Sequence, residues 1–233
     1  MTQSFRPLGQ PHAWKETRAA AAMGGRIYLA GADGHLHVVD GQTGEARVLG
    51  AGGKHIRLLA ATRGHIYAFD EAGPLYAVEP GGAWERLDGD WADARVAVGA
   101  DRVYVMGGNG LVGIDCGEHS WRPIGDGSWN TELLLATSNE LFALEEDGSL
   151  YRIDRDDGSF AQLDGDWGDV CAGAGAQGRL YLMATTGALY SVSVDGDFEP
   201  LDTGTHWDTR ILMAGPSCLY ALEHSGSLYV ISL

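Results

Sequence analysis

One short pattern occurs six times along the 233 residues and constrains the fold more than any other feature of the sequence. Each copy joins an apolar–aromatic pair, a turn containing glycine and a second short apolar segment, as in IYAFDEAGPLYAVE and LFALEEDGSLYRID. Successive copies are spaced by 39, 37, 38, 39 and 39 residues, measured between the aromatic residues Tyr28, Tyr67, Tyr104, Phe142, Tyr181 and Tyr220. A fixed period of this length is typical of repeat proteins, in which each repeat forms one supersecondary unit.

Two further apolar segments complete the repeat. One has the form aromatic-x-x-Leu/Ile, as in Trp84 to Leu87 and Phe160 to Leu163, and the other follows a tryptophan, as in RVAVGA and RILMAG. Four short strands joined by glycine turns, with no sustained helical periodicity, are typical of propeller blades. The sequence therefore predicts an all-β, six-bladed β-propeller of short four-stranded blades, with residues 1–233 as a single domain.

The two ends of the sequence predict how the last blade is completed. The sixth copy stops at SLYVISL without its aromatic-x-x-Leu strand, whereas the N-terminus begins with an unattached one, Phe5 to Leu8. We expect residues near 4–8 to pair beside residues 227–232, so that the N-terminal strand joins the C-terminal blade and closes the ring. Closure would remove an open sheet edge, which otherwise invites aggregation.

The same motifs resemble two families of lectin. Aromatic-x-x-Leu-x-Gly followed by LYAL and SGSLY is similar to the tectonin repeat. The stretch IGDGSWNTELLLATSNELFAL resembles the propeller lectins of the tachylectin type, which have a Gly-Gly-Trp before the innermost strand. The resemblance extends over the whole chain at the level of the repeat, and it implies a carbohydrate-binding protein.

Charge and composition make several functions improbable. The chain has 16 Lys and Arg against 32 Asp and Glu, a formal net charge of −16. Nucleic acid phosphates and anionic lipid surfaces would be repelled, so we expect neither as a partner. No run of 18 apolar residues and no signal-peptide core is present, which predicts a cytoplasmic protein without membrane insertion and leaves non-classical secretion as the alternative.

Motifs for catalysis, cofactors and metals are also missing. The sequence has no Gly-x-Ser-x-Gly, HExxH or Walker-type loop, and Cys116, Cys171 and Cys218 have no CxxC spacing. We expect small packing cysteines, no metal, no cofactor and no catalytic residue. A non-catalytic monomer is favoured, although the sequence leaves an enzyme open.

A tryptophan precedes the innermost strand in five of the six repeats, and LDGDW occurs twice, at residues 87–91 and 163–167. Each of these tryptophans could pack between blades, or its ring could stack on the apolar face of a sugar while a nearby aspartate accepts hydroxyl hydrogen bonds. The candidate residues are Trp14, Trp91, Trp129, Trp167, Trp207, Asp90, Asp126 and Asp166.

The basic residues suggest a different site. Lysine occurs only twice, at Lys15 and at Lys54, and Lys54 stands where the second repeat should have its tryptophan. His55, Arg57 and Arg210 lie at similar positions, so blades one, two and six would gather basic groups on one face. Such a patch could hold a carboxylate, a phosphate or a peptide terminus, could hold a metal through imidazoles, or could reflect only drift in surface loops.

Three functional hypotheses follow. The leading one is a lectin-like protein that uses the Trp and Asp loops and binds several equivalents of sugar. The alternative is a single basic, His-rich site for an anionic small molecule or peptide, in a biosynthetic enzyme or an accessory protein. The third is a protein-interaction scaffold. Stoichiometry separates the first from the second, because the basic patch would bind one equivalent.

Overall fold

The computed structural model describes residues 4–50, 55–108, 110–201 and 203–233. Their strands form six four-stranded antiparallel sheets, and the described residues contain no helix. This architecture is the predicted six-bladed β-propeller. Contacts between Cα atoms divide the chain into two compact units of three blades each, Glu16–Trp129 and the pair of segments Met1–Lys15 and Asn130–Leu233, which we call the terminal unit.

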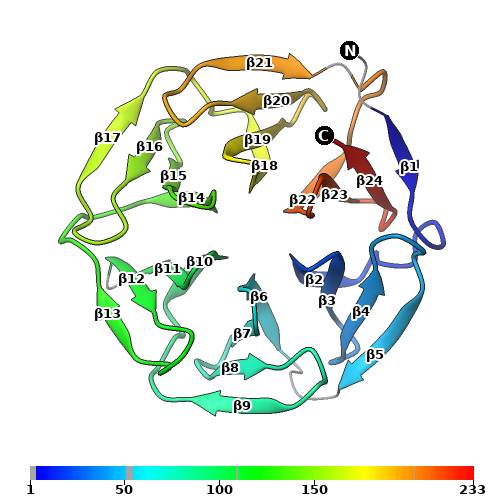
Figure 1. Cartoon of the computed structure of the whole chain (residues 1–233), viewed down its shortest axis with the longest axis horizontal. Helices are drawn as coiled ribbons and strands as arrows, with labels where there is room; N and C mark the ends of the chain where they lie inside the picture. The colour runs from blue at the N-terminus through cyan, green and yellow to red at the C-terminus, as the bar shows by residue number, and fades with distance from the viewer. Residues whose placement is uncertain (1–3, 51–54, 109, 202) are drawn as a thin grey trace. The chain divides into compact units, whose positions relative to one another are not determined.

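The Glu16–Trp129 unit contains blades 1 to 3, each of which uses consecutive strands, as can be followed in Figure 1. Neighbouring blades in this unit contact each other through their first strands, β2, β6 and β10. The strands are β2 (Thr17–Met23), β3 (Arg26–Gly31), β4 (Leu36–Asp40), β5 (Ala46–Gly50), β6 (Ile56–Ala61), β7 (Ile66–Asp70), β8 (Leu75–Val78), β9 (Trp84–Leu87), β10 (Ala94–Gly99), β11 (Val103–Gly107), β12 (Gly110–Ile114) and β13 (Trp121–Pro123).

The terminal unit contains blades 4 to 6, and its first strands β14, β18 and β22 contact one another in the same way. Its strands are β1 (Phe5–Pro7), β14 (Thr131–Ala136), β15 (Leu141–Glu145), β16 (Leu150–Ile153), β17 (Phe160–Leu163), β18 (Val170–Ala176), β19 (Arg179–Ala184), β20 (Leu189–Val192), β21 (Phe198–Leu201), β22 (Thr209–Ala214), β23 (Cys218–Glu223) and β24 (Leu228–Ser232).

Strand β1 completes blade 6, as the unattached N-terminal motif predicted. It pairs antiparallel with β24 in the register Phe5↔Ile231, Arg6↔Val230 and Pro7↔Tyr229. The amide of Leu8 extends the ladder by donating to the Leu228 carbonyl at 2.8 Å, and the Leu8 side chain is buried. Blade 6 is therefore built from the two ends of the chain (Figure 1).

The repeated aromatic residues lie in the core, and two of the tryptophans that precede first strands, Trp167 and Trp207, pack on aromatic rings of their own blades. In blade 5, the ring of Trp167 meets Phe198 at 5.1 Å and Tyr190 at 6.1 Å between centroids. In blade 6, Trp207 meets Phe5 at 5.1 Å and Tyr229 at 5.4 Å. All four contacts are edge-to-face, the arrangement that aromatic quadrupoles favour.

The first strand of every blade contains a β-bulge. Pairing with the second strand skips one residue in each case, and the skipped residues are Arg18, Arg57, Arg95, Glu132, Cys171 and Arg210. A bulge leaves one residue unpaired and turns its side chain in a new direction. The repeat therefore presents one redirected side chain per blade at the start of the first strand, four of them arginines.

Aspartates that follow the third strands fix the next turn. Asp40 Oδ1 accepts from the amides of Gln42 at 2.9 Å and Thr43 at 2.8 Å, and Asp115 Oδ1 accepts from Gly117 at 2.8 Å and Glu118 at 2.9 Å. These hydrogen bonds lower the pKa of both carboxyl groups. The largest effect comes from the Thr43 amide for Asp40 and from the Glu118 amide for Asp115.

These turns predict a dependence of stability on pH. A carboxyl whose pKa is lower in the folded protein stabilises it above the unfolded pKa of about 3.9, and this stabilisation is lost as the pH falls through the folded pKa. At pH values below about 4, we expect the urea concentration at the unfolding midpoint to decrease. The decrease should be smaller in the double variant Asp40→Asn, Asp115→Asn, because the asparagine amides do not titrate. An equal fall in both proteins would show that these turns do not contribute.

Candidate functional site

An open hollow of about 900 Å³ lies within the Glu16–Trp129 unit. Three segments and one arginine line it: residues 92–95 at the start of β10, the glycines Gly107, Gly108 and Gly110, residues 125–129, and Arg57 of β6. We call it the Trp129 hollow and call the segment before each first strand the lead-in loop. Two arginines, two aspartates, a serine and an indole line a site that is otherwise mostly glycine and alanine.

Glycine allows the three segments to approach so closely. A Cβ at Gly107 would lie 2.7 Å from the carbonyl oxygen of Asp93, and one at Gly127 would lie 2.6 Å from Nε1 of Trp129. Gly110 has a φ of 80° and faces the Gly127 carbonyl, which a Cβ would approach to 3.3 Å. The hollow consequently has walls made largely of glycine and alanine, so few side chains fill it.

Bulged arginines fix the lead-in loops around the hollow. Arg57 Nη2 donates to the carbonyls of Trp91 at 2.9 Å and Ala92 at 2.8 Å, and its Nη1 donates to Ala94. One repeat later, Arg95 donates to the carbonyl of Trp129. Each arginine thus bridges its own blade to the lead-in loop of the next. Arg95 is a lining residue that the sequence reasoning missed, although its spacing of 38 residues from Arg57 marks it as the equivalent position.

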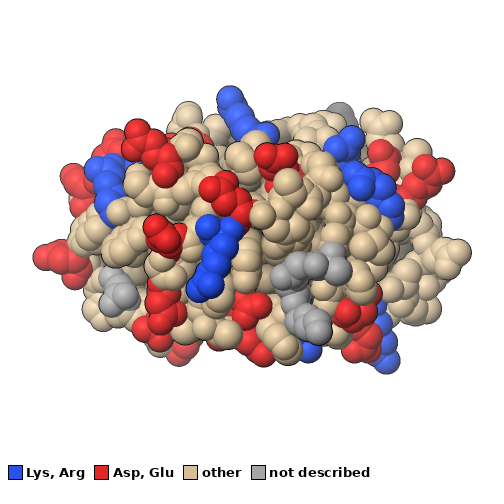
Figure 2. Space-filling model, turned by 90° about the horizontal axis from the view of Figure 1, so that it is seen from below, with Lys and Arg blue, Asp and Glu red and all other residues tan. Residues whose placement is uncertain are grey.

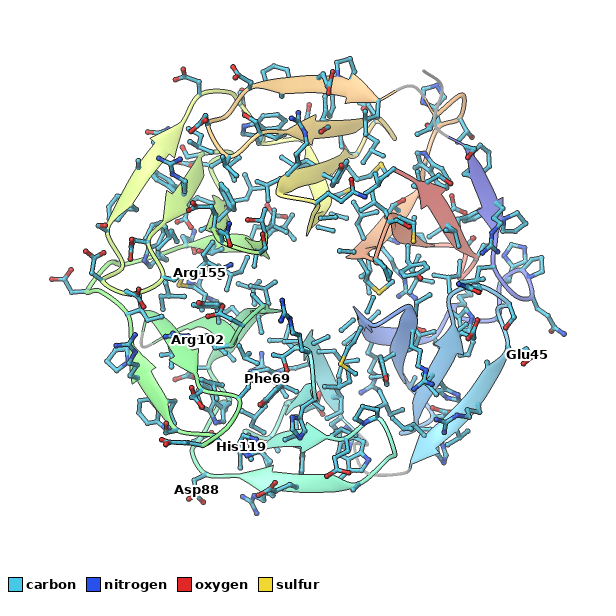
Figure 3. All side chains as sticks on the ribbon, in the orientation of Figure 1. Glu45, Phe69, Asp88, Arg102, His119 and Arg155 are labelled. Carbon is cyan, nitrogen blue, oxygen red and sulfur yellow. The ribbon has the colours of Figure 1, made fainter. Side chains whose placement is uncertain are left out.

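The five lead-in tryptophans differ in exposure. Trp91, Trp167 and Trp207 are 8%, 5% and 5% exposed, so their rings pack in the core and offer little surface for stacking. Phe69, labelled in Figure 3, meets Trp91 at 6.0 Å within this packing. Trp14 and Trp129 are half-buried, and of these two only Trp129 lines the hollow.

The candidate aspartates also differ in their surroundings. Asp90 and Asp166 are exposed, and each accepts from the amide two residues later, Ala92 at 3.1 Å and Gly168 at 3.2 Å. These bonds fix the turns of the two LDGDW segments. Asp126 lines the hollow instead, together with Asp93, which the sequence reasoning did not single out.

The predicted basic patch is distributed between the two units. In the terminal unit, Arg210 Nη2 donates to the carbonyls of Trp14 at 2.8 Å and Lys15 at 3.3 Å, so Lys15 and Arg210 are neighbours. Arg57 and His55 belong to the Glu16–Trp129 unit, where His55 Nδ1 lies 3.0 Å from Glu71 Oε1. Lys54 lies outside the described residues. The five-residue patch therefore stays a prediction.

Other chemistry was sought across residues 4–50, 55–108, 110–201 and 203–233. This part of the chain holds no group of three His, Cys, Asp or Glu side chains placed to bind a metal ion, and none of it forms a helix able to cross a membrane. Cys116, Cys171 and Cys218 are free thiols. Figure 2 shows acidic and basic side chains interspersed on the face that it presents.

The fold is that of known β-propellers. Virginiamycin B lyase from Staphylococcus aureus matches with a TM-score of 0.67 at 9% identity, over 98% of this chain and 99% of that one. Two proteins from Bacteroides thetaiotaomicron match as well. One, of unknown function, has a TM-score of 0.74 at 12% identity, over 99% of this chain and 76% of that one. The other, an auxiliary nutrient binding protein, has a TM-score of 0.69 at 9% identity, over 94% of this chain and 69% of that one.

These likenesses define the class of protein, a β-propeller built of repeats. At such low identities they show the fold alone. No family model and no curated protein sequence matches the chain. The resemblance to tectonin and tachylectin repeats is not confirmed by the comparisons and remains a sequence-based hypothesis.

Proposed function

We propose that the protein binds a carbohydrate, without catalysis, in the Trp129 hollow. The observation that carries the proposal is the position of Trp129, a half-buried indole that lines an open hollow beside carboxylate, guanidinium and hydroxyl groups. The auxiliary nutrient binding protein is a fold neighbour with a binding role in its name, which gives this function a precedent on the fold.

The lining residues match the chemistry of a sugar ring. An indole face stacks on the apolar C–H face of a pyranose, while the hydroxyls at the ring edge need hydrogen-bond partners. Asp93 and Asp126 supply acceptors, and Arg95 and Ser128 supply donors. Arg95 also bonds to the Trp129 carbonyl, so the stacking residue is held from the side of the preceding blade.

The hollow changes the expected stoichiometry. The sequence alone favoured several sites, one for each tryptophan loop. Because three of those five tryptophans are buried, we propose one equivalent of sugar at the Trp129 hollow. Their burial instead assigns Trp91, Trp167 and Trp207 a part in blade packing.

The test is the variant Trp129→Ala, titrated by calorimetry against a panel of methyl glycosides at millimolar concentration. Loss of stacking should weaken binding by about 1–3 kcal/mol, by analogy with stacked bases, which is roughly 5- to 150-fold. The matched control is Trp14→Ala, since Trp14 is the other half-buried lead-in tryptophan and belongs to the terminal unit. Wild-type affinity in Trp129→Ala, or no binding of any glycoside by the wild type, would contradict the proposal.

A further inference from the structure

We infer that the sugar taken by the Trp129 hollow is an acidic one, a hexuronate-type ring whose carboxylate lies toward Arg57. This inference rests on the proposed function, because it specifies the ligand class of the same site. It starts from Arg57, which the sequence singled out as a basic residue and which proves to line the hollow.

Arg57 forms no ion pair with an acidic side chain of the described residues, although Asp93 and Asp126 line the same hollow. Its hydrogen-bond partners are three backbone carbonyls, those of Trp91, Ala92 and Ala94. Other arginines pair with carboxylates: Arg152 lies 3.2 Å from Asp195, and Arg102, labelled in Figure 3, lies 3.6 Å from Asp101. A half-buried cation without an ion-pair partner attracts a ligand carboxylate more strongly than an exposed one does.

The hydrogen bonds of Arg57 also fix its orientation. Because both terminal nitrogens are bonded to the lead-in loop of blade 3, the guanidinium pays little further side-chain entropy when a ligand binds. Its Nε–H is buried and does not face the open hollow, so a ligand would meet the Nη1 hydrogen that the Ala94 carbonyl does not take. The Arg57 guanidinium is therefore a cationic group held in a fixed orientation at one wall of the hollow.

The two aspartates of the hollow determine which end of the ligand meets Arg57. A Cβ at Gly108 would lie 3.3 Å from Asp93 Oδ2, which places this carboxylate beside Gly108. Asp126 belongs to the lead-in loop of Trp129. Both repel an anionic group and accept hydroxyl hydrogen bonds. A ring with hydroxyls at one edge and a carboxylate at the other satisfies Asp93, Asp126 and Arg57 together.

The experiment compares neutral and acidic sugars that differ only at C6. Methyl β-D-glucoside is paired with methyl β-D-glucuronide, and methyl β-D-galactoside with methyl β-D-galacturonide, each titrated into the full chain by calorimetry. We expect one uronide to bind about 10-fold more tightly than its neutral partner, the gain typical of one charge-assisted hydrogen bond. Arg57→Met should abolish this preference, and Arg57→Lys, which keeps the charge, should retain part of it.

Salt provides a measurement that needs no substitution. Between about 0.02 M and 1 M NaCl the wild-type preference for the uronide should shrink, while the affinity for the neutral sugar stays nearly constant. This readout holds even if Arg57→Met disturbs the lead-in loop that Arg57 bonds.

The outcomes separate this inference from the proposed function. Equal binding of both members of each pair overturns the inference and leaves carbohydrate binding intact. A preference that persists unchanged in Arg57→Met, or that does not respond to salt, also overturns it. Binding of neither member of either pair at millimolar concentration overturns the inference, and no binding of any glycoside overturns the proposed function as well.

Discussion

Replacing Gly99 with alanine should cost about 3 kcal/mol or more of the free energy of unfolding. Gly99 lies at the end of β10, the first strand of blade 3, which contacts β6, the first strand of blade 2. A Cβ at this position would overlap the carbonyl group of Ala61 in β6. Since the overlap is with backbone, no rotamer change relieves it, and β6 and β10 would have to separate.

Urea unfolding measures this cost, with Gly64→Ala as the matched control. A Cβ at Gly64 would meet no atom within 4 Å, so this variant should differ from the wild type by less than about 1 kcal/mol. Gly175→Ala should behave like Gly99→Ala, because a Cβ there would overlap the carbonyl of Ala136 in the terminal unit. Similar stabilities for Gly99→Ala and Gly64→Ala would show that the strands accommodate the methyl group.

The close approach of first strands has a periodic signature that the sequence could have revealed. The position of Gly99 is small in every repeat, and its equivalents are Ala22, Ala61, Ala136, Gly175 and Ala214. The blades and their strands were predictable for the same reason, because strand patterning and turn glycines are local and recur every 37 to 39 residues. Strand β1 was predictable because only one repeat lacked its fourth strand.

Exposure of the tryptophans could not be predicted from the repeat. Trp167 and Trp129 follow similar segments, GDW and GSW, yet the first is buried and the second is half-buried. In the case of Trp167, the rings of Tyr190 and Phe198 on the outer strands pack against the indole. These contacts join residues far apart in the chain, so a local motif does not determine which tryptophan remains accessible.

The hydrogen-bond partners of the arginines could not be predicted from the sequence either. Arg57 and Arg210 were interpreted as groups that meet a ligand. The structure shows that each donates to carbonyl oxygens of the next lead-in loop. A carbonyl is present at every residue, so sequence patterns do not show which one a guanidinium meets. The β-bulge that turns these side chains toward the loops could not be predicted from the sequence either, because it depends on the pairing register.

Deleting residues 1–10 should remove most of the stability of the terminal unit. The deletion takes away β1, the buried Leu8 side chain and the Phe5 ring that packs on Trp207. Full burial of a leucine contributes about 2–3 kcal/mol, and each interstrand hydrogen bond adds about 1 kcal/mol. The sum of about 5 kcal/mol or more is comparable to the whole stability of a typical domain.

Calorimetric melting and the soluble yield measure the effect of this deletion. The edge of β24 would be left without its partner strand, a form prone to association, so both the melting temperature and the solubility should fall. Leu8→Ala, which keeps the strand and loses only side-chain burial, should give a smaller loss of about 2–3 kcal/mol. A synthetic peptide of residues 1–10 added in trans should raise the melting temperature of the deleted protein with increasing concentration, because it binds only the folded state. An unchanged melting temperature after deletion, or a deleted protein that the peptide does not stabilise, would contradict the role of β1 in completing blade 6.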